Sequence, residues 1–371
     1  MRIAYISLHW PRLHSSGVGK KIYRQMDAWQ DAGFIVRFFM HTTAYEHSDD
    51  LVPGEIFVYR LQNGLFGRLG GEFDRITAAH KLVHTVRAFA PDLIYLRYGI
   101  YVYPIHRLAS IAPLIEEVTT NDLTQHKRLG HLYNIYNRLT RGIILKRTSG
   151  LICLSKELAK SPGIAIYQKP IKVIGDGVDL ANTEPLKAPN NKQPHLVFIG
   201  SPDTPWQGVD KLVLLANRIP DLSIHIIGYD HLDGFTVLPD NLTLHGYLDT
   251  SQYKKILAQM DLAISSLALH RIGMEESSPL KTRECLAYGL PMILPYVDTD
   301  LHDLDCDFIM RIPNKEDNVR THAHLIREFA YRMRGCRADR EMLISRIDSH
   351  HKELARLSFF KEIIRDSDSP L

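Results

Sequence analysis

The feature that most constrains the fold is an alternation of short apolar runs with helix-length stretches. In the first half, apolar runs such as 2–8 and 93–98 are separated by stretches with helical spacing. Short apolar runs spaced in this way predict β-α-β units and a parallel sheet. The alternation resumes at 195–200 and continues to about 296. The sequence therefore predicts an α/β protein with two doubly wound domains in tandem.

A polar segment separates the two halves. Residues 181–194 contain three prolines and show no hydrophobic periodicity, which is typical of a linker. We therefore predict a first domain over 1–180 and a second domain over 195–351. The last amphipathic stretch, 352–366, is a candidate to pack back on the first domain.

Length and composition agree with two globular domains. The chain has 371 residues, of which 45% are hydrophobic, and it contains no apolar run long enough to span a membrane. Its N-terminal apolar run predicts a first strand and not a signal peptide. The cysteines lie far apart without a C-x-x-C pair, which predicts reduced thiols in a cytoplasmic protein and argues against a structural zinc. They are Cys153, Cys285, Cys306 and Cys336.

Basic residues are concentrated in the first half. Residues 1–150 carry 19 lysines and arginines against 12 acidic residues, whereas the net charge of the whole chain is only +3. This excess indicates an anionic partner but is too small to make nucleic acid the expected one. Residues 126–147 have six basic residues, no acidic ones, and interleaved apolar residues. They are a candidate for contact with an anionic membrane, and the alternative is an ordinary helix with a solvated basic face.

The segment 273–293 has the pattern of a helix that starts at a ligand-binding edge. Ligands of open α/β sheets bind beyond the carboxyl ends of the strands, and this segment follows the apolar run 262–269. We predict Ser278 as the N-cap, Pro279 as the first helical residue and Gly289 as the end of the helix. The N-terminus of such a helix favours an anion.

Charged residues surround this predicted helix start. Lys281 lies in the first turn and is expected to add a full positive charge, and Glu284 lies on the same face three residues later. Glu276 precedes the cap and can point at a ligand. A phosphate position with two carboxylates nearby predicts a nucleotide-sugar site. The alternative is a capped helix with surface glutamates.

The stretch MEESSPLKTRECLAYGLP resembles the signature of retaining glycosyltransferases of family 4, which have the GT-B fold of two Rossmann-like domains facing a cleft. The resemblance covers essentially the whole chain. It implies that Glu276 lies over the donor sugar and that Glu284 binds the ribose of the nucleotide. It also implies that the backbone after Glu276 holds the sugar hydroxyls and the diphosphate. The residues concerned are Ser277, Ser278, Pro279 and Leu280.

Other stretches carry the same resemblance. SSGVGKKIYRQM resembles the glycine loop of the family, in which Gly17 would approach the donor phosphate. FIGSPDTPWQGVDKL resembles the start of the second domain, with Gly200 and Gln207 as donor-binding candidates. Gln207 occupies the place of a phosphate-binding lysine, and the arginine that family members often have there is absent. We therefore expect Lys281 to neutralise the charge of the phosphates, with Arg271 as a further candidate.

Further residues are candidates for contact with the acceptor and the base, the first two of them from the resemblance. Thr119 occupies the place of a histidine that many members carry, and Glu117 resembles a glutamate of a bacterial polysaccharide-assembly branch. His14 flanks the glycine loop, so these three residues are acceptor-side candidates. Tyr247 is a candidate for contact with the base.

The sequence thus predicts a retaining glycosyltransferase that moves a sugar from a nucleotide diphosphate to a hydroxyl of a glycan or lipid-linked acceptor, in polysaccharide or glycoconjugate synthesis. Glu276 would orient the sugar, and Lys281 would stabilise the leaving diphosphate. No metal or other cofactor is expected, and Asp298 and Asp300 are interpreted as a solvated loop. The alternatives are a nucleotide-sugar 2-epimerase of the same fold and a non-catalytic nucleotide-sugar-binding protein.

Overall fold

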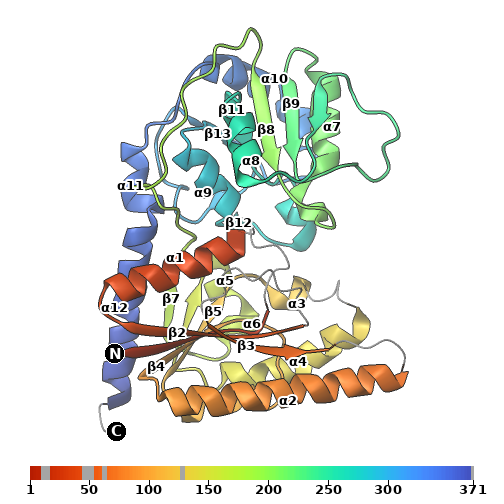
Figure 1. Ribbon diagram of the computed structural model, residues 1–371. Coiled ribbons are helices and arrows are strands. Elements are labelled where there is room, and N and C mark those ends of the chain that lie inside the picture. Colours follow the sequence, from red (N-terminus) through yellow and green to blue (C-terminus); the bar gives the residue numbers. More distant parts are fainter. Residues whose placement is uncertain (10–16, 44–53, 61–64, 126–129, 369–371) are drawn as a thin grey trace. The chain divides into compact units, whose positions relative to one another are not determined.

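The chain forms two compact units. In a computed structural model, the described residues are 1–9, 17–43, 54–60, 65–125 and 130–368. One unit consists of Met1–Ile174 with Glu353–Leu371, and the other of Gly175–Lys352 (Figure 1). The predicted linker, 181–194, is counted in the second unit and contains no regular helix or strand.

The first unit is built on a parallel sheet. Seven strands pair in the order β3-β2-β1-β4-β5-β6-β7, and all neighbouring strands are parallel. The strands are β1 Arg2–Ser7, β2 Ile35–Thr43, β3 Gly54–Tyr59, β4 Leu93–Arg97, β5 Leu114–Val118, β6 Gly150–Cys153 and β7 Ile171–Val173.

Both faces of this sheet are buried, which explains the nearly continuous apolar character of its strands. Successive residues of a strand point to opposite faces. Tyr5 accordingly packs with Trp29 and Phe360 on one face, and the ring centroids of Tyr5 and Trp29 lie 5.3 Å apart. Ile6 packs with Leu82 on the other face. Residues from the two ends of the sequence therefore share one core.

Helices connect the strands of the first unit. They are α1 Gly17–Asp31, α2 Leu65–Phe89, α3 Asp122–Gln125, α4 His131–Leu145, α5 Lys156–Lys160 and α6 Pro162–Ala165. The sequence of 122–147 has the pattern of one long helix, but that prediction is wrong, because Gly130 has φ 107° and stands outside α4 as its N-cap. A left-handed backbone of this kind cannot continue an α-helix, and glycine adopts it without steric cost.

The second unit has its own parallel sheet, in the order β10-β9-β8-β11-β13-β15, and a separate two-stranded pair, β12-β14. Its strands are β8 His195–Ile199, β9 Ser223–Ile227, β10 Leu242–Leu244, β11 Leu262–Ile264, β12 Glu276–Ser277, β13 Met292–Leu294, β14 Val297–Asp298 and β15 Ile309–Arg311. Its helices are α7 Val209–Arg218, α8 Thr250–Leu257, α9 Leu280–Ala287, α10 Asn318–Met333 and α11 Glu341–Ile347.

The last helix, α12 Ser349–Asp368, begins in the second unit, and its residues from Glu353 onward belong to the first. Leu357, Phe360 and Ile363 are buried in the core that contains β1 and α1. The Glu353 carboxylate accepts a hydrogen bond of 2.7 Å from the Trp29 indole N–H. The first unit is thus completed by residues that come last in the chain.

Candidate active site

Helix α9 begins one residue later than predicted. Pro279 is its N-cap, with φ −75° and ψ 137°, and the Pro279 carbonyl accepts from the backbone N–H of Thr282 at 3.1 Å. Ser278 was predicted as the N-cap, and this prediction is wrong. Its hydroxyl accepts hydrogen bonds from the backbone N–H of Asp176 at 2.7 Å and from the guanidinium of Arg283 at 2.8 Å. The serine therefore anchors the start of the helix instead of capping it.

A buried arginine braces this turn from within α9. Arg283 is fully buried and forms two hydrogen bonds with the Asp298 carboxylate, at 2.7 and 2.8 Å. It also contacts the Asp300 carboxylate at 2.7 Å, and the Asp176 carbonyl at 3.0 Å. Asp298 and Asp300 are therefore not a solvated loop. They neutralise a charge that would be costly to bury without partners.

Glu276 lies in β12, next to the start of α9. This short strand pairs in parallel with β14, so that Glu276 is beside Val297 and Ser277 beside Asp298. The Glu276 side chain is buried, with 8% of the residue exposed. The same two-strand pair thus holds Glu276 and the aspartate that binds Arg283. Glu276 is therefore positioned by the backbone and not carried on a free loop.

Lys281 is partly buried in the first turn of α9. Its ammonium group donates to the Ile199 carbonyl at 2.9 Å and lies 4.2 Å from the centroid of the Phe198 ring. These contacts place it at the carboxyl end of β8, where parallel sheets bind ligands. Burial lowers the pKa of Lys281 to about 7. This lower pKa opposes the full positive charge that the sequence predicts for Lys281 as long as no anion lies beside it.

Glu284 lies one turn further along α9 and is partly exposed. Burial raises the pKa of the Tyr288 phenol, and the negative charge of Glu284 raises it further. The phenol therefore stays protonated at physiological pH and can donate a hydrogen bond. Glu276, Lys281 and Glu284 are thus all held on β12 and α9 of one unit.

The loop after β8 needs a glycine. The Gln207 side-chain oxygen accepts from the backbone N–H of Ser201 at 3.2 Å. A Cβ atom at Gly200 would lie 2.1 Å from that oxygen, so a larger residue would displace it. The Tyr229 hydroxyl also donates to the Ser201 carbonyl, at 2.6 Å. Gly200 and Gln207 hence shape this loop together.

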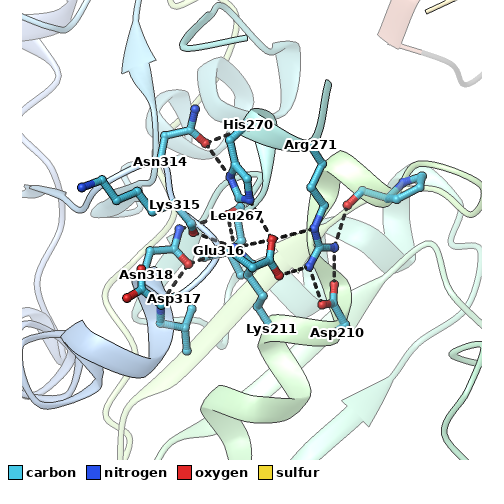
Figure 2. A network of polar contacts seen from close by, with 12 residues as sticks. Asp210, Lys211, Leu267, His270, Arg271, Asn314, Lys315, Glu316, Asp317 and Asn318 are labelled. Atoms are coloured by element: carbon cyan, nitrogen blue, oxygen red, sulfur yellow. Dashed lines mark hydrogen bonds and ion pairs between the residues drawn. The ribbon is translucent and has the colours of Figure 1, made fainter. Parts of the chain in front are cut away.

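Arg271 lies at the edge of a cavity of about 330 Å³ that is lined by the loops after β8 and β9. Its guanidinium donates to both Asp210 oxygens, at 2.8 and 2.7 Å, and to Glu316 (Figure 2). The predicted contact with phosphate would have to compete with two carboxylates. We therefore interpret Arg271 as a brace for the loop and not as a free cation.

The segment that leads into β12 is held by the same network of hydrogen bonds and ion pairs. His270 contacts the Glu316 carboxylate at 2.7 Å, and its backbone N–H donates to the Asn314 side chain at 3.0 Å (Figure 2). The buried Lys211 ammonium donates to the Lys315 carbonyl at 2.8 Å. Hydrogen bonding to Arg271 lowers the pKa of Glu316 to about 2, so that its charge persists over the whole physiological range.

The candidates outside α9 have different surroundings. Tyr247 is 60% exposed after Gly246, so its side chain is accessible to a ligand. Gly17 is the first residue of α1 in the first unit. Thr119 follows β5 and is half-buried. His14 lies outside the described residues.

The surroundings of Glu117 differ most from those expected of a residue that contacts the acceptor. It is fully buried at the end of β5, and its carboxylate contacts Lys21 at 2.9 Å, Arg97 at 3.3 Å and Arg356 at 3.6 Å. Burial alone would raise the pKa of Glu117, but the three cations lower it to about 2. Glu117 therefore joins α1, β4 and α12 inside the first unit. A direct contact with acceptor would require it to leave these partners.

Sequence reasoning missed Arg283, Lys21 and Arg97. Each is a cation whose partner lies on another element, so spacing along the chain does not reveal it. One signal was present for Arg283: two aspartates follow a buried strand close to a helix that carries this arginine. Within the described ranges, no group of three or more metal-ligating side chains could hold a metal ion, and no helix is long and apolar enough to cross a membrane.

No protein-family model matches the chain, and no curated protein matches it. Solved structures do match over almost its full length. A sucrose-phosphate synthase from Thermosynechococcus elongatus has a TM-score of 0.66 and 13% identity, with 98% of this chain and 99% of that chain covered. The lipopolysaccharide outer core galactosyltransferase WaaB has a TM-score of 0.68 and 11% identity, with 99% and 100% covered. Anabaena HepE in complex with UDP-glucose has a TM-score of 0.59 and 13% identity, with 98% and 100% covered. The chain therefore has the GT-B fold that its sequence predicts.

Proposed function

We propose that the protein is a retaining glycosyltransferase that uses a nucleotide-diphosphate sugar. The observation that carries this proposal is the arrangement around α9. Glu276, Lys281 and Glu284 occupy β12 and one short helix, and the buried Arg283 braces the turn between them. A helix N-terminus beside a lysine suits a diphosphate, and carboxylates suit the hydroxyls of sugar and ribose.

Each residue has a defined part in the proposed reaction. The backbone N–H groups at the start of α9 and Lys281 would stabilise the charge that develops on the leaving diphosphate. Glu276 would orient the donor sugar, and Glu284 would bind the ribose. A diphosphate oxygen would take the proton of the acceptor hydroxyl on the same face, which retains configuration. We propose that the diphosphate charge is met in this way without a metal ion or other cofactor.

The likeness to known structures guides the choice of donor. HepE was solved with UDP-glucose, and a matching α-glucosyltransferase was solved with UDP and DNA. Uridine nucleotides are therefore the first donors to test, with Tyr247 as the proposed contact with the base. For the acceptor we propose a glycan or lipid-linked hydroxyl in polysaccharide or glycoconjugate synthesis, in the cytoplasm.

The exposed face of α4 supports a peripheral membrane contact. Leu132 and Leu139 are 78% and 76% exposed, and Tyr133 is 53% exposed. The two leucines are seven residues apart and so share one exposed helix face. Binding to anionic vesicles that is lost in Leu132→Ser/Leu139→Ser would support this contact. Equal binding of both proteins would contradict it.

The central experiment combines a panel of nucleotide sugars with Glu276→Ala. We expect one donor to be bound and slowly hydrolysed or transferred, and the variant to lose at least about 100-fold in turnover while it keeps affinity for the nucleotide. Glu328→Ala, an exposed change on α10, serves as the control.

The same panel separates the alternatives. A 2-epimerase would convert the donor sugar without an acceptor. A non-catalytic protein would bind a nucleotide sugar and turn over none. If no nucleotide sugar is bound or consumed by the unaltered protein, the proposed function is wrong.

A further inference from the structure

A cavity in the first unit lies away from α9. It has a volume of about 280 Å³ and opens among the loop after β5, helix α4 and the turn between α5 and α6. These loops follow the carboxyl ends of β5 and β6, which is the edge at which parallel sheets bind ligands. No residue assigned to the donor site lines this cavity.

One wall of the cavity holds a buried ion pair. Arg141 donates to the Asp122 carboxylate from Nε at 2.7 Å and from Nη2 at 2.9 Å, and its Nη1 donates to the Gly163 carbonyl at 2.7 Å. Asp122 also accepts from the Tyr98 hydroxyl at 2.7 Å and from the Asn137 amide at 2.6 Å. The aspartate is thus saturated. Asp122, the Gly163 carbonyl and the Tyr98 hydroxyl together account for up to four of the five N–H bonds of Arg141.

A second arginine gives this wall a positive charge. Arg138 is exposed, lies one turn before Arg141, and lines the same cavity. Its hydrogen bond to a described residue is a long one of 3.4 Å to Asn134, and it pairs with no carboxylate among the described residues. Because Asp122 offsets only Arg141, the lining carries a net charge of about +1.

The nearest buried acid does not remove this charge. Glu116 is 1% exposed, and one of its side-chain oxygens has no hydrogen-bond partner among the described residues. Burial raises the pKa of Glu116 to about 8, although Arg141 acts in the opposite direction. Glu116 is therefore mostly protonated at neutral pH, and a net positive wall faces the cavity.

Neutral polar groups complete the lining. Thr120 and Asn121 line the cavity and bring a hydroxyl and an amide to it. Ser161 lines it too, and its hydroxyl, which donates to the Leu158 carbonyl at 2.7 Å, can still accept. Cations next to amide and hydroxyl groups suit a ligand that carries an oxyanion and several hydroxyls.

We propose that this cavity binds an oxyanion, either carboxylate or phosphate, on a sugar unit of the acceptor. The acceptor would then be an acidic glycan, and Arg138 would select for its charge. Arg141 would supply the fixed donors at the back of the cavity, and Asn121 would bind a hydroxyl. The identification of this ligand as the acceptor rests on the proposed transferase function. Binding of an oxyanion in the cavity does not depend on that function.

The test uses three monosaccharide probes on the full chain without any donor. Glucuronate carries a carboxylate, glucose 6-phosphate carries a phosphate, and glucose carries neither. We expect at least one charged probe to bind with a millimolar dissociation constant, as is common for small fragments, and at least about tenfold more tightly than glucose. Chemical shift changes in isotope-labelled protein would report both the affinity and the location.

Variants decide whether the cavity is the site. Arg138→Gln and Asn121→Ala are at accessible positions and spare the buried ion pair. We expect Arg138→Gln to weaken binding of the charged probe about tenfold and to leave the affinity for glucose unchanged. Arg147→Gln, at a basic residue in the turn just after the same helix and outside the cavity, is the matched control and should bind like the unaltered protein.

The outcomes separate the two proposals. Charged probes that bind no better than glucose, or binding unchanged by Arg138→Gln, would overturn the cavity assignment whatever the donor panel shows. Binding at the cavity in a protein that consumes no nucleotide sugar would leave the cavity as an oxyanion site and overturn the transferase. A preference for phosphate over carboxylate, or the reverse, would name the acidic group of the acceptor.

Discussion

Lys281 is a residue whose charge depends on its ligand. Its ammonium group lies over the Phe198 ring and on the Ile199 carbonyl, so that burial lowers its pKa to about 7. A diphosphate beside it would favour the protonated form and raise that pKa again. Binding would therefore be linked to proton uptake.

This linkage predicts the pH dependence of donor binding. Between about pH 7 and pH 9 the empty protein loses the Lys281 proton, whereas the complex keeps it. We expect the affinity for the preferred nucleoside diphosphate to fall over this range, by at most about tenfold per pH unit. Calorimetry in two buffers of different protonation enthalpy would measure the proton taken up.

Lys281→Arg is the matched variant for this prediction. Arginine remains protonated throughout, so its affinity should be nearly independent of pH above about 7. The same pH dependence in both proteins would show that another group is responsible.

Replacement of Arg283 is expected to destabilise the fold strongly. Replacing it with methionine leaves Asp298 buried without its partner, and we expect a loss of about 3–5 kcal/mol in the free energy of unfolding. Arg327 pairs with Asp221 on the surface, where water screens the interaction, so Arg327→Met should destabilise the protein far less than Arg283→Met. Urea unfolding compares the two variants. Similar losses would mean that the buried pair contributes no more than an exposed one.

At the scale of elements, the sequence predicted most strands because parallel strands are buried on both faces and read as apolar runs. It missed β3, an edge strand that is only partly buried and therefore lacks such a run. It also joined two helices across Gly130, whose positive φ interrupts the helical backbone. The predicted start of α9 was wrong by one residue. The Ser278 hydroxyl accepts a hydrogen bond from the backbone N–H of Asp176, about 100 residues earlier, instead of capping the helix.

Three neighbouring elements form a histidine ladder that no spacing predicts. His225 of β9 contacts His245 at 2.9 Å and His195 of β8 at 3.1 Å, and the adjacent rings are stacked. A neutral His225 can donate one hydrogen bond and accept the other. Burial, and then the two other imidazoles, lower the pKa of His225 to about 4.

The ladder predicts a loss of stability in acid. The unfolded chain binds the proton near pH 6.5, whereas the folded chain binds it only near pH 4, so the contribution of His225 is lost as pH falls through this window. As the pH is lowered from about 6.5 to about 4, we expect the Tm of His225→Gln to fall less steeply than the Tm of the unaltered protein. Nuclear magnetic resonance would follow the imidazole itself, and a His225 that titrates near pH 6.5 would contradict the prediction.

At the scale of the whole molecule, α12 makes the first unit discontinuous in sequence. Phe360 packs on Trp29, and Arg356 contacts Glu117, so the C-terminal residues fill the core and balance its charge. The second unit, Gly175–Lys352, contains its own sheet and core.

Removing residues 353–371 should therefore affect the units unequally. We expect the first unit to lose protection from hydrogen exchange and proteolysis, while the second keeps most of its own. Adding a peptide of residues 353–371 should restore protection of the first unit. Equal loss in both units, or none in either, would contradict this prediction.

The late position of α12 also sets an order of events during synthesis. The β-strands of the first unit are synthesised early, whereas the residues of α12 that pack on one face of their sheet follow the whole second unit in the chain. The second unit has all its residues once position 352 has emerged, so it can complete its fold first. Until then the nascent first unit exposes the apolar surface on which Phe360 later packs, and transiently exposed apolar surface of this kind is prone to aggregate.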